Sequence, residues 1–127
     1  MTKTVYDTRF LVEVYYSNNP KTQQKINNQK KQKQKYISTI VIHEIFHLSL
    51  KREGRETATL RTTLLKQDFK TIPVNNEIAE TSAELRNKYN LSMADSIIAA
   101  TATKLKAICI SDDPHFKQIK EIKTTWI

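Results

Sequence analysis

The stretch LSMADSIIAATATKL, residues 91–105, decides how the rest of the chain is interpreted. Its apolar residues recur at intervals of three and four, which predicts an amphipathic helix with a wide buried face. These residues are Leu91, Ala94, Ile98, Ala102 and Leu105. Ser92 suits the N-cap position, and it places Asp95 in the first turn. Asp95 is therefore either part of a capping box or an acid held at a functional site, and three other acids in similar positions favour the site.

Composition narrows the classes of protein and of partner. The net charge is +8, from 21 Lys and Arg residues against 13 Asp and Glu residues, and this excess favours polyanionic partners such as nucleic acid. The single cysteine, Cys109, excludes an internal disulfide and indicates a reducing compartment. The only glycine, Gly54, argues against phosphate-binding glycine-rich loops. The sequence has no membrane-length apolar run and no signal-peptide pattern, so we expect a cytoplasmic protein that does not contact membranes.

Runs typical of strands alternate with runs typical of helices along all 127 residues. The β-branched and apolar runs that predict strands are residues 2–6, 36–42, 69–74, 107–110 and 122–126. The expected helices lie between them, at residues 10–15, 45–50, 57–65, 77–89 and 91–105, and a short one begins at Pro114. This alternation predicts one α/β domain, residues 1–127, with a mostly parallel sheet and helices on both faces.

Residues 21–35 are nearly all Lys, Gln and Asn, which predicts either a solvated helix or a mobile segment. The simplest interpretation is an exposed charged face. The functional alternative is a basic arm that contacts the phosphates of a nucleic acid. The candidate contacts are Lys21, Lys25, Lys30 and Lys31.

Four acids lie at expected junctions of strands and helices. Asp7, Glu44 and Asp113 each follow a predicted strand, and Asp95 opens a helix. Each acid alone has a structural explanation, as a helix cap or a surface residue. Residues that follow parallel strands collect at one sheet edge, however, and clustered carboxylates raise one another's pKa or require a cation. Such a cluster favours Mg²⁺ or Mn²⁺, which can promote hydrolysis of a phosphodiester.

Four segments carry a resemblance to PIN-domain ribonucleases, most closely to VapC-type toxins. They are VYDTRFLVE, STIVIHEIF, IPVNNEIAETSAELRNKYNLSMADSIIAATA and ICISDDPHF, which together extend over nearly the whole chain. The resemblance implies that four acids are catalytic and bind the metal, namely Asp7, Glu44, Asp95 and Asp113. It also implies that Ser111 supports them through a hydrogen bond. Asp112 makes the fourth acid ambiguous and is kept as a supporting residue, since the spacing of Asp113 to Ser111 and Phe116 fits the family motif.

The same resemblance implies a PIN-like three-layer α/β sandwich with a mostly parallel central sheet flanked by helices. It further implies an endoribonuclease that depends on Mg²⁺ or Mn²⁺ and leaves 5′-phosphate and 3′-hydroxyl ends on RNA. The protein would be a homodimer, and a small antitoxin would inhibit it by blocking the acidic groove.

Two other functions compete with this interpretation. The sequence HEIFH, residues 43–47, matches the H-E-x-x-H motif of zinc metalloproteases, in which a helix presents both histidines to zinc. Against it, the preceding run predicts that His43 lies at a strand end, only Glu56 or His115 offers a third ligand, and the other acids stay unexplained. The second alternative is a basic PIN-like module that binds RNA or protein without catalysis, although all four acids are present.

Overall fold

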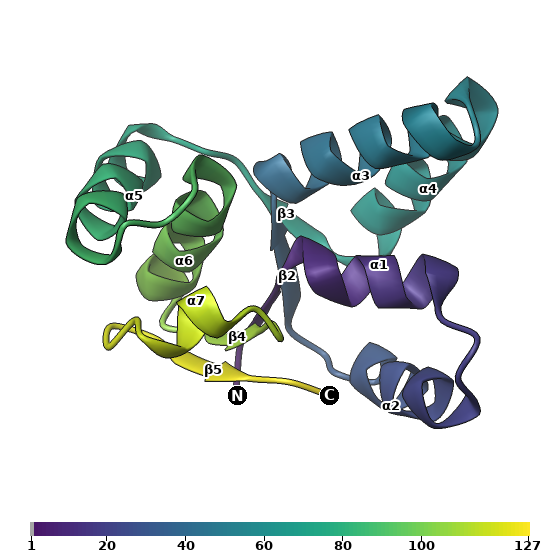
Figure 1. The fold of residues 1–127 in the computed structure, drawn as a ribbon, viewed down its shortest axis with the longest axis horizontal. Coiled ribbons are helices and arrows are strands. Elements are labelled where there is room, and N and C mark those ends of the chain that lie inside the picture. Colours follow the sequence, from purple (N-terminus) through teal and green to yellow (C-terminus); the bar gives the residue numbers. More distant parts are fainter. Residues whose placement is uncertain (1) are drawn as a thin grey trace.

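The computed structural model describes residues 2–127 and contains one five-stranded sheet, which is parallel throughout, with strand order β3-β2-β1-β4-β5 (Figure 1). The strands are β1 (Thr4–Tyr6), β2 (Lys35–Ser38), β3 (Lys70–Ile72), β4 (Ile108–Ile110) and β5 (Lys123–Thr125). The helices are α1 (Thr8–Tyr16), α2 (Pro20–Lys30), α3 (Thr39–Arg52), α4 (Arg55–Asp68), α5 (Asn76–Tyr89), α6 (Met93–Leu105) and α7 (Pro114–Lys117). The predicted α/β sandwich with a central parallel sheet is confirmed.

The order of the strands creates a switch point in the sheet. The chain runs from β1 outward to β2 and β3, then returns past β1 to β4 and β5. Right-handed crossovers therefore place α1–α4 on one side and α5 and α6 on the other, as Figure 1 shows. The side chains that follow β1 and β4 meet at the carboxyl edge between these two strands, where ligands bind in open α/β sheets.

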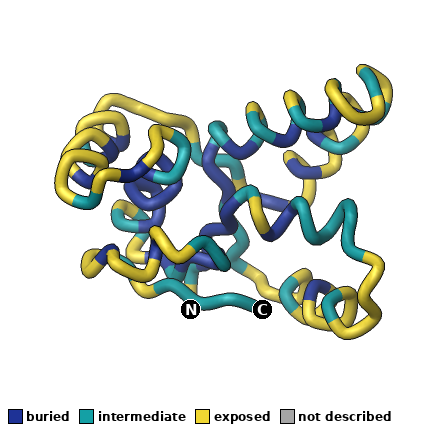
Figure 2. Tube along the Cα trace, viewed as in Figure 1, coloured by how far each residue is buried: buried dark blue, intermediate teal, exposed yellow. Residues whose placement is uncertain are grey.

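The core is centred on β1 and α6. Val5 and Tyr6 of β1 are fully buried, and so is Cys109 of β4, as expected for a small apolar side chain. Every residue of α6 from Ser96 to Ala102 is buried, because its small side chains let α5, α3 and β1 approach closely (Figure 2). The predicted helix at residues 91–105 is thus confirmed, and it packs against β1, β2 and β4 of the sheet.

The expectation of a long strand at residues 36–42 was wrong. β2 ends at Ser38, whose Oγ accepts a hydrogen bond from the Ile40 N–H at 3.2 Å and so caps α3. Val41, Ile45 and Ser49 then form a buried stripe at intervals of four residues. Burial of this helical face outweighs the β-propensity of the branched residues that begin α3.

Residues 20–30 form a regular helix, α2, so the alternative of a mobile segment does not hold there. Asn19 caps the helix by accepting a hydrogen bond from the Lys21 N–H at 2.9 Å, and Pro20 occupies the first position. Ile26 is its only buried residue, and the Gln29 Oε1 accepts a hydrogen bond from the buried Tyr6 hydroxyl at 3.0 Å. Most other residues of the helix are exposed (Figure 2).

The remaining boundaries differ from expectation by a few residues. α4 is longer than the expected helix at residues 57–65, and β3 is shorter than the expected strand at residues 69–74. Gly54 separates α3 from α4 with a φ of 96°, a conformation that favours glycine. None of the helices within residues 2–127 combines the length and the apolar character needed to cross a bilayer.

Candidate active site

Asp7 and Ser111 join the carboxyl ends of β1 and β4. Asp7 occupies the N-cap position of α1, yet its side chain makes no capping hydrogen bond. It is instead 3 % exposed, and its Oδ2 accepts a hydrogen bond from the Ser111 Oγ at 2.6 Å. The two neighbouring strands thus hold this carboxylate in one orientation at the switch point.

The environment of Asp7 disfavours its charge. Burial raises the pKa of Asp7 to about 6, and the nearby charges of Asp95 and Glu44 also raise it, while the hydrogen bond from Ser111 lowers it. The influence of Asp95 and Glu44 on Asp7 shows that acids from three separate segments share one region.

Glu44 reaches this region by a different route from the one expected. It lies inside α3 and does not follow a strand, so the expected placement at a strand end was wrong. The Thr8 Oγ1 donates a hydrogen bond to the Glu44 Oε1 at 2.5 Å, which directs the carboxylate toward the start of α1. Glu44 lies well beyond the end of β2, but α3 runs in a direction that keeps its carboxylate close to Asp7 at the end of β1.

Asp95 lies in the first turn of α6, where the predicted cap is present. The Ser92 Oγ accepts a hydrogen bond from the Asp95 backbone N–H at 3.2 Å. Burial raises the pKa of the Asp95 carboxyl, and the charges of Asp113 and Glu44 raise it further. The cap and the acidic site therefore use different atoms of one residue.

Asp113 caps α7 and faces Asp95. Its Oδ1 accepts a hydrogen bond from the His115 backbone N–H at 2.9 Å and lies 2.7 Å from the Nδ1 of the same residue. Burial raises the pKa of Asp113, but these contacts with His115 outweigh it and hold the pKa below its ordinary value. Asp95 and Asp113 are thus adjacent carboxyls whose environments move their pKa values in opposite directions.

His115 is the residue that sequence reasoning missed at this site. Among residues 2–127, one group of three side chains could hold a metal ion, namely Asp95, Asp113 and His115, whose donor atoms lie within 4.8 Å of one another. The signal was present in the sequence Asp113-Pro114-His115. In this pattern the N-cap aspartate accepts a hydrogen bond from the backbone N–H of the residue after the proline. That residue is His115, so its side chain also lies close to the carboxylate.

Asp112 lies apart from this group of donors. Its two carboxylate oxygens accept hydrogen bonds from Arg9, from Nε at 3.0 Å and from Nη2 at 3.1 Å. Arg9 is another residue that the sequence did not identify, and it neutralises the extra acid next to Asp113. Of the two adjacent acids, Asp113 is the one whose carboxylate lies beside Asp95.

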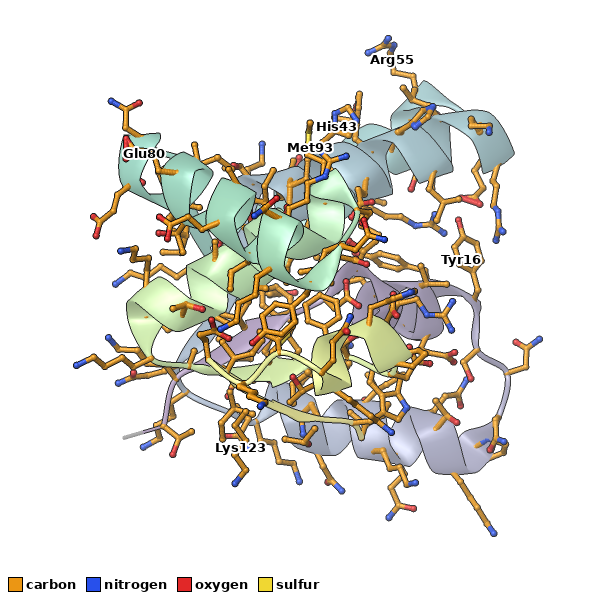
Figure 3. All side chains as sticks on the ribbon, turned by 60° about the vertical axis from the view of Figure 1, so that its left-hand side comes forward. Tyr16, His43, Arg55, Glu80, Met93 and Lys123 are labelled. Atoms are coloured by element: carbon orange, nitrogen blue, oxygen red, sulfur yellow. The ribbon has the colours of Figure 1, made fainter. Side chains whose placement is uncertain are left out.

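The H-E-x-x-H residues do lie on a helix, so the expectation that His43 lies at a strand end was wrong. His43 and His47 are exposed on α3, with ring centroids 6.2 Å apart, and Figure 3 shows His43 at the surface. Neither histidine belongs to the group of possible metal donors found in the described chain, and His115 lies with Asp95 and Asp113 instead. The third zinc ligand of a metalloprotease is therefore missing.

The four candidate RNA-contacting lysines, called here the α2 lysines, are all exposed. They are Lys21, Lys25, Lys30 and Lys31. Lys30 and Lys31 lie just before β2, at the edge of the sheet opposite the acids. A hollow of about 750 Å³ at this edge is lined by more lysines, including Lys33, Lys35, Lys66 and Lys70. The α2 lysines Lys30 and Lys31 and the acidic site thus lie at opposite ends of the parallel strands.

Comparisons with known proteins agree with this architecture. The family model described as the PIN domain matches residues 4–122. A chain of a toxin–antitoxin complex from Klebsiella pneumoniae is 27 % identical with a TM-score of 0.77, and the match covers 98 % of this chain and all of that chain. A search of curated protein sequences gave no match.

Two more distant structures share the fold. VapBC2 from Rickettsia felis, bound to a DNA fragment from its promoter, is 17 % identical with a TM-score of 0.81, and the match covers 98 % of each chain. VapC20 from Mycobacterium tuberculosis, a toxin that cleaves the sarcin–ricin loop, is 17 % identical with a TM-score of 0.75, over 95 % of this chain and 99 % of that one. The switch-point site, the parallel sheet and the match over residues 4–122 together show that this chain belongs to the PIN domain family.

Proposed function

We propose that this protein is a metal-dependent endoribonuclease that hydrolyses RNA phosphodiesters, and that it is the toxin of a VapBC-type toxin–antitoxin pair. The observation that carries the proposal is the convergence of Asp7, Glu44, Asp95 and Asp113 from four segments on the carboxyl edge between β1 and β4. The similarity to a chain of a toxin–antitoxin complex and to the toxin VapC20 supports it.

The chemistry of the site fits a divalent cation. Burial and mutual repulsion raise the pKa of Asp7 and of Asp95, so a bound cation would stabilise their ionised forms. Carboxylate oxygens are the donors that Mg²⁺ and Mn²⁺ accept, and the donor atoms of Asp95 and Asp113 lie close enough to share one ion. When bound, such a cation would offset the negative charge on the phosphate and activate water for an in-line displacement.

The residues of the chain have distinct parts in this proposal. Asp95, at the start of α6, and Asp113, at the start of α7, would hold the cation. Asp7, fixed by Ser111, and Glu44, fixed by Thr8, complete the acidic wall and orient what binds against it. With a pKa of about 6, Asp7 is largely ionised at neutral pH and is able to accept a hydrogen bond from an incoming water.

The test is cleavage of RNA by purified protein with Mg²⁺, with Mn²⁺ and with EDTA. We expect cleavage only with a divalent ion, and its loss in Asp95→Asn, since Asn keeps the shape but removes the charge. Asp112→Asn is the matched control, because Asp112 pairs with Arg9 and should leave cleavage nearly unchanged. Cleavage that persists in EDTA, or in Asp95→Asn, would refute the proposal.

The proposed partners are RNA, a small antitoxin protein and a second copy of the chain. Some of the similar structures are DNA-bound VapBC complexes, which supports an antitoxin partner. A protein partner usually binds to exposed apolar surface, and the described residues provide such surface in two places. Leu60 and Leu64 are exposed on α4, and Val74 and Met93 are exposed near the start of α6.

A module that binds RNA without cleaving it remains the competing function. It predicts RNA binding that weakens with salt, and no cleavage with any divalent ion. The retention of all four acids at one site, each oriented by neighbouring polar groups or by helix caps, favours catalysis over binding alone.

A further inference from the structure

The tightest group of possible metal donors in the part of the chain that the structure describes includes a nitrogen donor. His115 lies with Asp95 and Asp113, and one donor atom of each falls within 4.8 Å of the others. The two carboxylates alone would leave the choice between Mg²⁺ and Mn²⁺ open, because both ions accept oxygen ligands. An imidazole nitrogen among the donors affects which of these two ions the site prefers.

The backbone holds His115 at this place. The Asp113 Oδ1 accepts a hydrogen bond from the His115 backbone N–H at 2.9 Å, which fixes the first turn of α7 against the carboxylate. The ring then lies beside Asp113, with Nδ1 2.7 Å from Oδ1. The side chain is 63 % exposed, so the ring has room to rotate about its own bonds without disturbing the core.

A cation bound between Asp95 and Asp113 would interact directly with the imidazole ring of His115. A protonated imidazole beside the cation would be repelled by it, so the ring must either turn away or offer a lone pair. The attachment of the backbone to Asp113 keeps the ring close, and the ring nitrogen is already among the atoms that could share one ion. A neutral imidazole that donates its lone pair removes the repulsion and adds a bond.

We propose that His115 is a direct nitrogen ligand of the metal ion held by Asp95 and Asp113, and that it makes the site select Mn²⁺ over Mg²⁺. Mg²⁺ is a hard ion that favours oxygen ligands and retains its waters. Mn²⁺ also favours oxygen ligands, but as the softer ion of the two it accepts an imidazole nitrogen more readily than Mg²⁺ does. The inference rests on the proposed metal-dependent function, and it assigns one further ligand and one selectivity to that site.

The alternative role for His115 is to orient Asp113 without touching the metal. A positioning role of this kind would weaken Mg²⁺ and Mn²⁺ binding by similar factors when His115 is removed. A direct ligand role predicts a selective loss of Mn²⁺ affinity. The ratio of the two affinities therefore separates the roles, whatever happens to the cleavage rate.

The experiment measures metal binding by the full chain at one fixed pH above 7, without RNA. Mn²⁺ is titrated and followed by electron paramagnetic resonance, and Mg²⁺ is measured by its competition with Mn²⁺. For His115→Ala we expect Mn²⁺ affinity to fall at least about tenfold, which is the lower figure for loss of even an outer partner of a ligand, and Mg²⁺ affinity to change much less. For His115→Asp we expect tight binding with the preference for Mn²⁺ lost, since the new donor is oxygen.

A spectroscopic readout tests the bond itself. Pulsed resonance of the Mn²⁺ complex should show coupling to an imidazole nitrogen in the unaltered protein and none in His115→Ala. His47→Ala is the matched control, because His47 is an exposed histidine on α3 outside the donor group, and it should retain both the coupling and the affinity.

Equal losses of Mn²⁺ and Mg²⁺ affinity in His115→Ala, or a nitrogen coupling that survives in it, would overturn the inference. The proposed function fails separately, through a different variant. If Asp95→Asn binds Mn²⁺ as tightly as the unaltered protein, the metal site itself is misplaced. If Asp95→Asn loses the metal while His115→Ala keeps the same preference for Mn²⁺, only the role of His115 is wrong.

Discussion

Asp7 is a buried carboxyl whose ionisation should destabilise the metal-free protein. Burial, with the charges of Asp95 and Glu44, raises the pKa of Asp7 from its ordinary value of 3.8 to about 6. At about 1.36 kcal/mol per pKa unit, the difference corresponds to about 3 kcal/mol of folding free energy. Asp7→Asn keeps the shape, and its amide oxygen can still accept the hydrogen bond from Ser111, so the variant should escape most of this cost.

The direction in which the stability of the protein changes with pH follows from proton linkage. The folded protein keeps the Asp7 proton up to about pH 6, whereas the unfolded chain releases it near pH 3.8. The contribution of Asp7 to stability is therefore fully present below pH 3.8 and is lost as the pH rises through 6. The free energy of unfolding of Asp7→Asn, relative to that of the unaltered protein, should rise by up to about 2.5 kcal/mol between pH 4 and pH 8.

The assay is urea unfolding in EDTA at a series of pH values, followed by the fluorescence of the single tryptophan, Trp126. Asp112→Asn is the control, since it removes a surface ion pair with Arg9 that is worth less than about 1 kcal/mol. Mn²⁺ at about 100 times its Kd should then stabilise the unaltered protein by about 2.7 kcal/mol and Asp7→Asn much less. A stability difference between Asp7→Asn and the unaltered protein that stays constant from pH 4 to pH 8 would show that the burial argument is wrong.

Three further outcomes are expected. Ser111→Ala should lower the RNA cleavage rate by about 10- to 100-fold, because the buried acid loses its orienting hydrogen bond, and Ser111→Thr should retain most activity; equal rates in the two variants would contradict this. Replacing the α2 lysines with Gln should weaken RNA binding in a filter assay and reduce its salt dependence, while the rate at saturating RNA stays unchanged; an unaltered salt slope would count against phosphate contacts. His43→Ala and His47→Ala should leave cleavage intact, and elemental analysis should find no tightly bound zinc that these changes remove.

Much of the fold could be predicted because helix caps and periodicity are local signals. Ser92 and Asp95 marked the start of α6 correctly, and the short strand β4, which pairs with β1, was found from its apolar run. The boundary between β2 and α3 could not be found in this way. The residues after Ser38 have strong β-propensity, and only their burial against other elements makes the helix favourable.

The candidate site shows the same division between local and long-range information. Asp7 directly follows β1, and Asp113 lies in the short segment between β4 and α7, so both follow strands as expected. Glu44 was chosen for a position that it does not have, yet the hydrogen bond from Thr8 shows that it belongs to the same region. His115 was missed as a member of this site because its role depends on a turn that brings its ring to Asp113 and on α6 lying opposite.

The structural and the functional interpretations of the acids are not alternatives in this protein. Asp113 caps α7 with one oxygen and faces Asp95, while the backbone of Asp95 completes a cap with Ser92. An acid at the start of a helix is stabilised by about 0.3–1 kcal/mol through the helix dipole, which is less than the cost of burying Asp7 with its neighbours. The helix starts can therefore hold the carboxylates in place without neutralising them. A cluster kept in position, in which two carboxyls have raised pKa values, is what a cation-binding site requires. It explains why residues with ordinary capping roles gather at the switch point of the sheet.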